Sequence, residues 1–296
     1  MLKGSVGNDK LFELFQGGGS GEVAGVFSSA VYFSLSGKMC LLHDSSYGII
    51  PFGIALPELA GRAEELGLAP DMKLSLESSV LSNKTAGFEI KLLFEREAVK
   101  PVAFDCLPAF ACGAERMLKT HGHSALAAYC MGSVAQVDKN SIEDIFAKTA
   151  YKGLVELEMA MSNPRLESMT NALKKLLGLG RGLTPSLDDF ICGMLYVLNY
   201  AGRTWSYKAP CLNELCRSVD ELAGECTNAY SAAYLLAASA GEDFSLMRLC
   251  LENSLKEDAA YSIKKLMRVG ASSGSDMLCG MCFAANYILK QRQVTL

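Results

Sequence analysis

The hydrophobic pattern of the chain changes character near Leu107. Before this point, β-branched and aromatic residues are enriched and turn residues interrupt them at short intervals, which is typical of a meander of β-strands. The break at Ser36-Gly37 suits a tight hairpin. The segments with strand character are 22–35, 39–43, 48–56, 75–81 and 88–94, and the amphipathic segment 57–69 predicts a short helix. We therefore expect an N-terminal sheet or barrel of about five to seven strands.

From Leu107 onward the apolar residues recur with a helical period, and short polar or Gly-containing links separate the helical segments. The expected helices are 107–119, 123–133, 141–161, 165–177, 185–201, 211–222, 224–239, 243–254, 257–268 and 275–290. Two of them, 185–201 and 275–290, are apolar nearly all round, which is typical of helices buried within a bundle. The expected fold class is α+β, with a β-rich domain at 1–105 followed by a larger helical domain at 106–296.

A Gly-rich segment precedes each of these two apolar helices. Gly178–Gly193 reads GLGRGLTPSLDDFICG, and Gly270–Gly280 reads GASSGSDMLCG. In both, a basic, Leu-rich run leads into glycines, then Ser-x-x-Asp, then an apolar segment containing Cys-Gly-Met. Gly193 and Gly280 correspond, and a glycine inside a helix costs about 1 kcal/mol relative to alanine. The repeat therefore predicts close contact between the two helices about a pseudo-two-fold axis, with both Gly-rich loops at one end of the bundle.

Two interpretations of the Ser-x-x-Asp motifs remain open. In the structural one, Thr184 caps the helix with proline at its first position, or Ser186 caps it with Asp189 three residues later, and Ser273 with Asp276 repeats that spacing. These side chains then only satisfy backbone donors. In the functional interpretation, the two helix N-termini converge on an anion such as a phosphate or a carboxylate.

The adjacent carboxyl group of Asp188 has no evident capping role, which favours a functional one. A third segment, 225–241, places Thr227, Asn228 and Ser231 at helical spacings on one face of an otherwise small, packable helix. Such hydroxyl groups either bind a ligand or lie at contacts between helices. The candidate catalytic residues are Asp188 and Asp189, and the candidate anion-binding residues are Gly180, Arg181, Gly182, Thr184, Ser186, Ser272, Ser273, Gly274, Asp276, Thr227 and Ser231.

The composition limits the classes of binding partner that we expect. The chain has 296 residues, with 28 basic and 32 acidic side chains and no long basic run or interleaved aromatic stripe, which argues against binding to nucleic acid or an anionic membrane. A small molecule or another protein is the expected partner. No segment approaches the roughly 20 apolar residues that span a bilayer, and the N-terminus lacks the apolar core of a signal peptide. We expect a cytoplasmic protein.

Metal and redox chemistry have little support in the sequence. The eleven cysteines lie mostly within apolar helical patterns, which favours reduced thiols, although Cys279 and Cys282 match Cys-x-x-Cys. His121 and His123 are interpreted as polar residues at a helix start, with ligation as the alternative. The stretch Gly17–Gly21 resembles a phosphate loop only in composition, because no Lys-Ser/Thr follows, and we interpret it as a flexible lead-in.

The two Gly-rich segments resemble the motifs of a known family. Gly178–Gly193 resembles the signature Gly-x-Gly-x-Gly-Leu-Thr-Pro-Ser-Gly-Asp-Asp-(apolar)₂-x-Gly of the AllH-like family, and Gly270–Gly280 resembles its second motif, Gly-x-(Ser/Thr)-Ser-Gly-x-Asp. The resemblance extends loosely over most of the chain, including the β-rich start. Two positions depart from the signature: Arg181 stands in place of proline, and Leu187 in place of glycine.

The resemblance implies a relationship to the AllH subunit of oxamate carbamoyltransferase, an enzyme of anaerobic allantoin breakdown and so of purine catabolism. That enzyme interconverts oxalurate plus phosphate with oxamate plus carbamoyl phosphate, and it works with partner subunits. All of these substrates are small anions, which backbone donors at helix N-termini and Arg181 are suited to hold. Asp188 or Asp189 would act as a general base or orient the amide nitrogen.

Several alternatives stay open. The Asp pair could instead hold Mg²⁺, although such sites usually recruit more than two adjacent carboxylates, and we expect no cofactor. The expected partners are other subunits of a carbamoyltransferase complex, and a homo-oligomer is the open alternative. The alternative function is a non-catalytic partner that senses a metabolite or serves assembly, while another subunit performs the chemistry.

Overall fold

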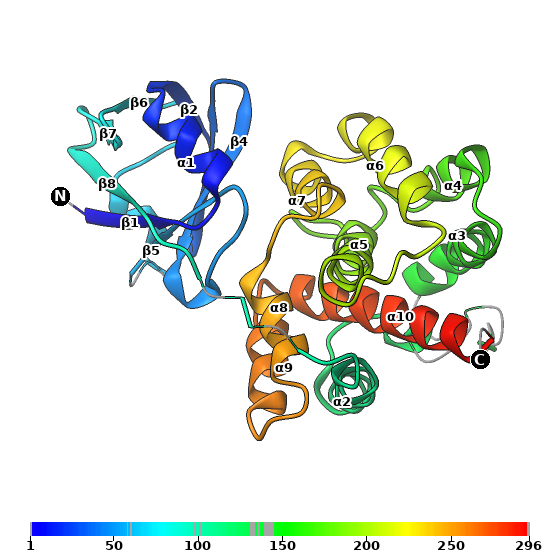
Figure 1. Ribbon diagram of the computed structural model, residues 1–296. Coiled ribbons are helices and arrows are strands. Elements are labelled where there is room, and N and C mark those ends of the chain that lie inside the picture. Colours follow the sequence, from blue (N-terminus) through cyan, green and yellow to red (C-terminus); the bar gives the residue numbers. More distant parts are fainter. Residues whose placement is uncertain are drawn as a thin grey trace. The chain divides into compact units, whose positions relative to one another are not determined.

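The computed structural model describes residues 2–57, 59, 61–97, 99–100, 102–130, 134, 137–138 and 145–294. The chain forms two compact units (Figure 1). The first comprises residues 1–99 together with 243–246, and the second comprises residues 100–242 and 247–296. We refer to them as the barrel unit and the helical unit.

The described strands of the barrel unit form one closed barrel. Their order around it is β1-β5-β4-β3-β2-β6-β7-β8, in which the pairs β1–β8 and β4–β5 are parallel and the others antiparallel. The strands are β1 (Leu2–Val6), β2 (Gly19–Phe27), β3 (Ala30–Leu35), β4 (Lys38–Asp44), β5 (Gly53–Leu56), β6 (Lys73–Glu77), β7 (Val80–Asn83) and β8 (Phe88–Phe94).

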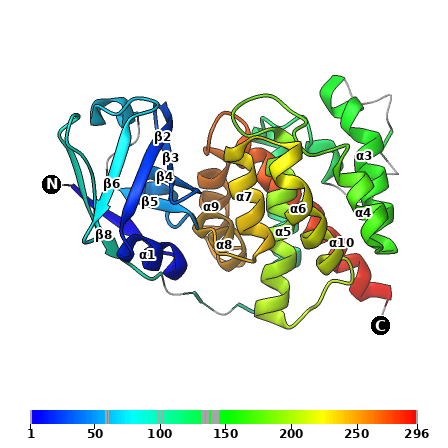
Figure 2. The same cartoon turned by 90° about the horizontal axis from the view of Figure 1, so that it is seen from above.

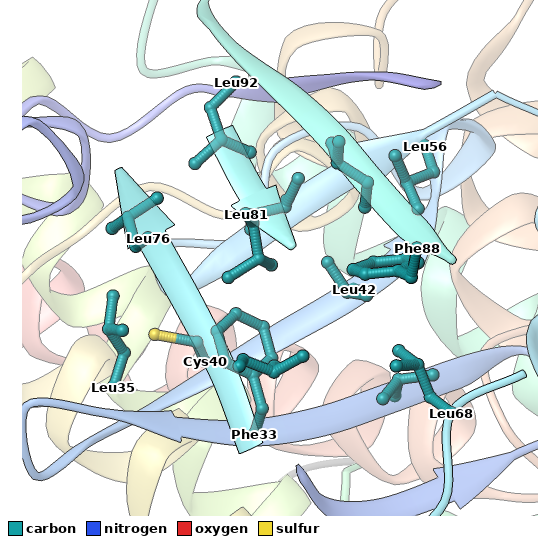
Figure 3. Close-up of a cluster of buried hydrophobic side chains, with 14 of the residues drawn as sticks. Phe33, Leu35, Cys40, Leu42, Leu56, Leu68, Leu76, Leu81, Phe88 and Leu92 are labelled. Atoms are coloured by element: carbon teal, nitrogen blue, oxygen red, sulfur yellow. The ribbon is translucent and has the colours of Figure 1, made fainter. Parts of the chain in front are cut away.

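Alternation of apolar and polar residues builds the barrel core. Along β8, Phe88, Ile90 and Leu92 are buried, whereas Glu89 and Lys91 between them are exposed, as the two-residue period of a strand requires. Figure 3 shows labelled side chains from β3 to β8 gathered in one cluster of buried hydrophobic residues. Closure gives every described strand a hydrogen-bonded neighbour on both sides, so the barrel has no open sheet edge.

The predicted hairpin is confirmed. Ser36 (φ 50°) and Gly37 (φ 77°) connect β3 to β4, and two consecutive positive φ angles are typical of the tight turns that match the twist of antiparallel strands. The α+β class is also confirmed. The barrel has more strands than the pattern predicted, partly because segment 22–35 is two strands, β2 and β3, separated by a turn at 28–29.

Two expectations for the barrel unit were wrong. Gly17–Gly21 is no flexible lead-in: Gly17 ends helix α1 (Asp9–Gln16), and Gly19–Gly21 already belong to β2, paired with both β3 and β6. Segment 57–69 forms only the short 3₁₀ helix η2 (Ala63–Leu66), and residues 58 and 60 lie outside the described residues. Gly61 (φ 70°) and Gly67 (φ 69°) flank η2 in the left-handed region, which ends any longer helix.

The helices of the second part of the chain largely follow the predicted segments. They are α2 (Cys106–His121), α3 (Ile145–Ser162), α4 (Leu166–Leu173), α5 (Ser186–Trp205), α6 (Leu212–Cys226), α7 (Ala229–Ser239), α8 (Ser245–Glu252), α9 (Ala259–Met267) and α10 (Ser273–Val294). Predicted helix 123–133 is wrong in its described part, which contains only the 3₁₀ turn η3 (Ala127–Tyr129); residues 131–133 and 141–144 lie outside the described residues. In the part of the chain that the structure describes, no helix has the length and apolarity to cross a bilayer.

Helices α5 and α10 form the centre of the helical unit, with α6 and α7 packed against α5 (Figures 1 and 2). They cross at the two corresponding glycines. A Cβ added to Gly193 would lie 2.0 Å from the carbonyl oxygen of Met277, and one added to Gly280 would lie 1.8 Å from that of Phe190. Each glycine thus faces the residue three positions before the other glycine, which confirms the predicted close contact and its pseudo-two-fold symmetry.

Candidate functional site

Both Gly-rich segments lead directly into the crossing helices. Helix α5 begins at Ser186, with Pro185 as the N-cap residue and no capping bond from a side chain, and α10 begins at Ser273. The helix starts are therefore where the motifs predicted, but the capping roles proposed for Thr184 and Ser186 were wrong, and that of Ser273 stays a prediction. Their hydroxyl groups are directed to carboxyl groups that the crossing brings near, as described below.

The loop before α5 needs its glycines. Gly178 (φ 76°), Gly180 (φ 141°) and Gly182 (φ 100°) all have positive φ. A Cβ on Gly178 would lie 2.3 Å from the carbonyl oxygen of Cys226 in α6, and one on Gly180 would lie 2.2 Å from the amide nitrogen of Ser186. The loop is thus folded tightly against the end of α6 and the start of α5.

Asp188 holds this loop and the α6–α7 junction together. One carboxylate oxygen accepts a hydrogen bond from the Gly178 amide at 2.8 Å, and the other accepts one from the Thr227 hydroxyl. Asn228 adds a second link, donating from its side chain to the Leu183 carbonyl at 2.8 Å. Asp188 therefore has a structural duty that the sequence did not reveal.

The third segment joins the site, but not as one helical face. Thr227 ends α6, and Asn228 is the N-cap of α7, where its side chain accepts from the amides of Tyr230 and Ser231. Only Ser231 lies in a helix. The single-face expectation was wrong because an Asn side chain that caps a helix interrupts the helical path.

Asp189 and Asp276 form the centre of the arrangement. Both are 1% exposed, and they occupy equivalent positions in the first turns of α5 and α10, one residue before the Phe190 and Met277 carbonyls at the helix crossing. The Thr184 hydroxyl donates to Asp189 at 2.8 Å and lies 2.8 Å from the Ser273 hydroxyl. The loop of one helix is therefore bonded to the first residue of the other.

Burial perturbs all three carboxyl groups, and neighbouring negative charge perturbs Asp189 as well. Burial raises the pKa of Asp189 well above its ordinary value of 3.8, and the charges of Asp276 and Asp188 raise it further, whereas hydrogen bonds from Thr184 and Ser273 lower it. Burial also raises the pKa values of Asp188 and Asp276. No lysine or arginine among the described residues contributes to these shifts.

Hydroxyl groups, including that of Ser186 at the start of α5, partly offset the rise that burial causes in the pKa of Asp276. Ser186 therefore faces the carboxyl group of α10, just as Ser273 faces that of α5. The other oxygen of Asp276, Oδ2, is buried and has no hydrogen-bond partner in the described structure. The Ser231 hydroxyl, near Asp188, is also buried without a hydrogen bond of good geometry.

Backbone donors at the two helix starts are only partly free. The Leu187 amide donates to Leu179, and the corresponding Gly274 amide donates to Val269. Among the described residues, the amides of Ser186 and Ser273 have no backbone acceptor, so one donor remains at the first position of each helix.

The remaining candidate positions lie around these helix starts. Arg181 and Gly182 are exposed on the loop, Gly180 and Ser272 are half-buried, and Gly274 is buried against the Leu266 carbonyl, 1.8 Å from where its Cβ would stand. The structure thus brings the predicted residues of both motifs to one end of α5 and α10.

Sequence reasoning missed Ser124 and the site-building role of Asn228. Ser124 donates to Asp276 Oδ1 from the segment that follows α2. His121 ends α2, so the stretch around His121 and His123 closes a helix where a helix start was expected. Ser124 carried no detectable signal, because a lone serine after a helix is common and only the tertiary fold brings it to Asp276.

The cysteines are free thiols in this structure. Cys279 and Cys282 are buried, and Cys282 donates weakly to the carbonyls of Ala111 and Cys130. Burial raises the pKa of both Cys130 and Cys282. Within the described residues, no three side chains of His, Cys, Asp or Glu are grouped so as to hold a metal ion.

The comparison with known proteins finds a match in the span that contains both Gly-rich loops. Residues 176–285 match the family model of oxamate carbamoyltransferase subunit AllH. The AllH match begins just before Gly178 and ends within α10, so it contains Asp188, Asp189, the α6–α7 junction and Asp276. It confirms the resemblance inferred from the two motifs. No solved structure matches the chain significantly.

Proposed function

We propose that this chain is a carbamoyltransferase subunit whose helical unit binds a small carbamoyl-bearing anion above the Asp189–Asp276 pair. The AllH family description supports the carbamoyltransferase association, and the matched span contains the whole pair with its loops. The substrates in view are oxamate with carbamoyl phosphate, and oxalurate with phosphate.

The observation that carries the proposal is the juxtaposition of two buried carboxyl groups with raised pKa values at the starts of two crossing helices. A structural core does not require two adjacent acids, since burying charge is costly. A raised pKa makes a carboxylate a stronger base and lets its neutral form donate a hydrogen bond to an anion. Both properties serve transfer between an amide and a phosphate.

The chemistry assigns a role to each group. The amides of Ser186 and Ser273, together with Arg181 on the exposed loop, bind the anionic ends of the substrates. Asp276 Oδ2, which has no partner in the described structure, accepts a hydrogen bond from the carbamoyl NH₂. Asp189 accepts the proton of the attacking amide nitrogen.

In the transfer step one C–N bond forms and one C–O bond breaks. The amide nitrogen of oxamate forms a C–N bond to the carbamoyl carbon, and the C–O bond between that carbon and phosphate breaks. The proton that leaves the nitrogen passes to Asp189 and then to the departing phosphate. Asp188 does not act in this step; it positions the Gly-rich loop through Gly178 and Thr227.

Titration calorimetry of the purified chain with phosphate, carbamoyl phosphate, oxamate and oxalurate tests the proposal. We expect saturable binding of these anions that Arg181→Ala weakens about tenfold or more, which corresponds to about 1.4 kcal/mol. Asp189→Asn should weaken the binding of oxamate, whose amide nitrogen donates to Asp189, by a similar factor. Arg203→Ala, at the far end of α5, and Asp220→Asn, exposed on α6, are matched controls that leave binding unchanged. Melting temperatures of all variants separate a binding defect from loss of fold.

Two outcomes would contradict the proposed function. Binding that survives both site variants contradicts an anion site at these loops. Failure of the well-folded chain to bind any of the four compounds favours the alternative function, a non-catalytic assembly partner of a carbamoyltransferase. Turnover by the chain alone would exclude both that alternative and a purely metabolite-sensing role.

A further inference from the structure

The barrel unit contains a cavity of about 280 Å³ that the proposed function does not use. Its lining combines a buried imidazole with two carboxylates and two hydroxyls: His43, Glu95, Glu97, Ser5 and Ser45. All of its lining residues belong to the barrel unit. The cavity is therefore a property of that unit by itself.

His43 presents an unused hydrogen-bond acceptor. The side chain, at the end of β4, is 1% exposed, and its Nδ1 lies 3.0 Å from the main-chain oxygen of Asp44. A carbonyl oxygen only accepts, so Nδ1 carries the proton and Nε2 carries a lone pair. Nε2 is buried and has no hydrogen-bond partner in the described structure. Burial lowers the pKa of His43 to about 4, so the ring is neutral near pH 7.

A glycine packs directly against this edge of the ring. A Cβ on Gly53, the first residue of β5, would lie 2.5 Å from Nε2 and 2.7 Å from Cδ2 of His43. Gly53 and His43 both line the cavity. Any larger residue at position 53 would clash with the His43 ring, so the close packing of the ring against β5 requires glycine.

The mouth of the cavity is acidic and held in place. Glu95 and Glu97 follow β8 and are exposed. Glu97 accepts a hydrogen bond from the Ser245 hydroxyl at 2.7 Å, and the same hydroxyl accepts from the Ile49 amide at 2.7 Å. No lysine or arginine is among the described residues that line the cavity. The cavity thus offers acceptors and negative charge to whatever enters it.

We propose that this cavity binds a small organic cation with N–H donors, such as an alkylammonium or guanidinium group, which donates to His43 Nε2 and lies near Glu95 and Glu97. The volume, just below the roughly 300–1,000 Å³ typical of ligand pockets, restricts the ligand to a small molecule. A metal ion is disfavoured, because the described residues contain no group of three His, Cys, Asp or Glu side chains suited to one. The inference concerns the barrel unit and is independent of the carbamoyltransferase proposal.

Histidine ring nitrogens provide the direct test, because the chain has only three histidines. Protein labelled with ¹⁵N in histidine is titrated with methylammonium, guanidinium and agmatine, and the His43 resonances are assigned as those retained when His121 and His123 are each replaced by asparagine. Tetramethylammonium is the control, since it carries the charge but no N–H donor. We expect a saturable shift of the Nε2 resonance with the N–H donors and none with tetramethylammonium.

Variants test the two halves of the site separately. Glu95→Gln removes one charge and should weaken binding about two- to fivefold at low salt. Glu89→Gln, exposed on β8 outside the cavity, is the matched control and should have no effect. His43→Asn retains a donor for the Asp44 carbonyl but lacks Nε2, and should weaken binding about tenfold.

Three results would overturn the proposal. The first is the absence of any saturable His43 shift at millimolar probe, and the second is equal binding of tetramethylammonium. The third is tight stoichiometric binding of Zn²⁺ at Nε2, which would replace the organic cation by a metal. If His43→Asn does not fold, as judged by circular dichroism, the wild-type titration and the Glu95→Gln and Glu89→Gln comparison still decide the question.

Discussion

Alanine at the crossing of α5 and α10 should destabilise the helical unit, although alanine favours helices. The positions are Gly193 and Gly280, which face the carbonyls of Met277 and Phe190. On helix propensity alone, each Gly→Ala change in an exposed helix would stabilise the fold by about 1 kcal/mol. We expect the opposite sign here because the added methyl group meets main-chain atoms that cannot rotate away.

The magnitude follows from the geometry. The added Cβ would lie 2.0 Å from one carbonyl oxygen in Gly193→Ala and 1.8 Å in Gly280→Ala, against 3.4 Å for ordinary van der Waals contact. The helices must therefore separate by more than an ångström along their contact. Overpacking a close-packed core typically costs about 1–3 kcal/mol, and main-chain displacement costs more, so we expect a net loss of about 2 kcal/mol or more.

Urea unfolding monitored by tryptophan fluorescence measures this effect in the right part of the chain. Trp205, the sole tryptophan, lies at the end of α5, packs edge-on against Phe104 and donates to the Val102 carbonyl at 2.8 Å. Its signal therefore reports the helical unit without a contribution from the barrel unit. Gly224→Ala in α6 is the matched control, since nothing lies within 4 Å of the added Cβ.

The comparison of the crossing variants with Gly224→Ala can contradict the prediction. We expect Gly224→Ala to be neutral or slightly stabilising and both crossing variants to unfold at lower urea. If Gly193→Ala or Gly280→Ala is as stable as Gly224→Ala, the two helices are not in main-chain contact at these glycines. The juxtaposition of Asp189 with Asp276, which depends on that contact, would then lose its basis.

Three further predictions concern Asp189, Thr227 and Cys112. Because burial raises the folded-state pKa of Asp189 well above 3.8, the unfolded chain loses this proton first, and the helical unit should lose stability as pH rises above 3.8 until the folded-state pKa is reached. Asp189→Asn should flatten this loss of stability with rising pH in Trp205-monitored unfolding. Thr227→Val removes a donor to the buried Asp188 and should lower the free energy of unfolding by about 1–3 kcal/mol, whereas an unchanged urea midpoint would contradict the bond. Cys112 is exposed, so a thiol reagent should modify it in the fastest phase of native labelling, and Cys112→Ser should abolish that phase.

Local patterns predicted much of the fold because local physics decides it. The Ser36-Gly37 turn followed from residues that tolerate positive φ, and the helices of the second unit followed from their apolar period. The failures have equally local causes. Segment 57–69 has a helical pattern, but its flanking glycines adopt left-handed conformations, and Gly17–Gly21 is loop-like in composition although main-chain pairing to two neighbours makes most of it a strand.

By itself the sequence determined that α5 and α10 are equivalent, buried and in close contact, because Gly193 and Gly280 recur after matching Ser-x-x-Asp motifs. It could not assign partners to the polar groups of those motifs. A serine or aspartate beside a helix start can bond its own backbone or a distant group, and the choice depends on what the crossing brings near. Only the tertiary structure decided that Asp188 holds a loop, that Asp189 and Asp276 meet, and that His43 faces a cavity with its lone pair unused, because each of these depends on chain segments that are distant in sequence.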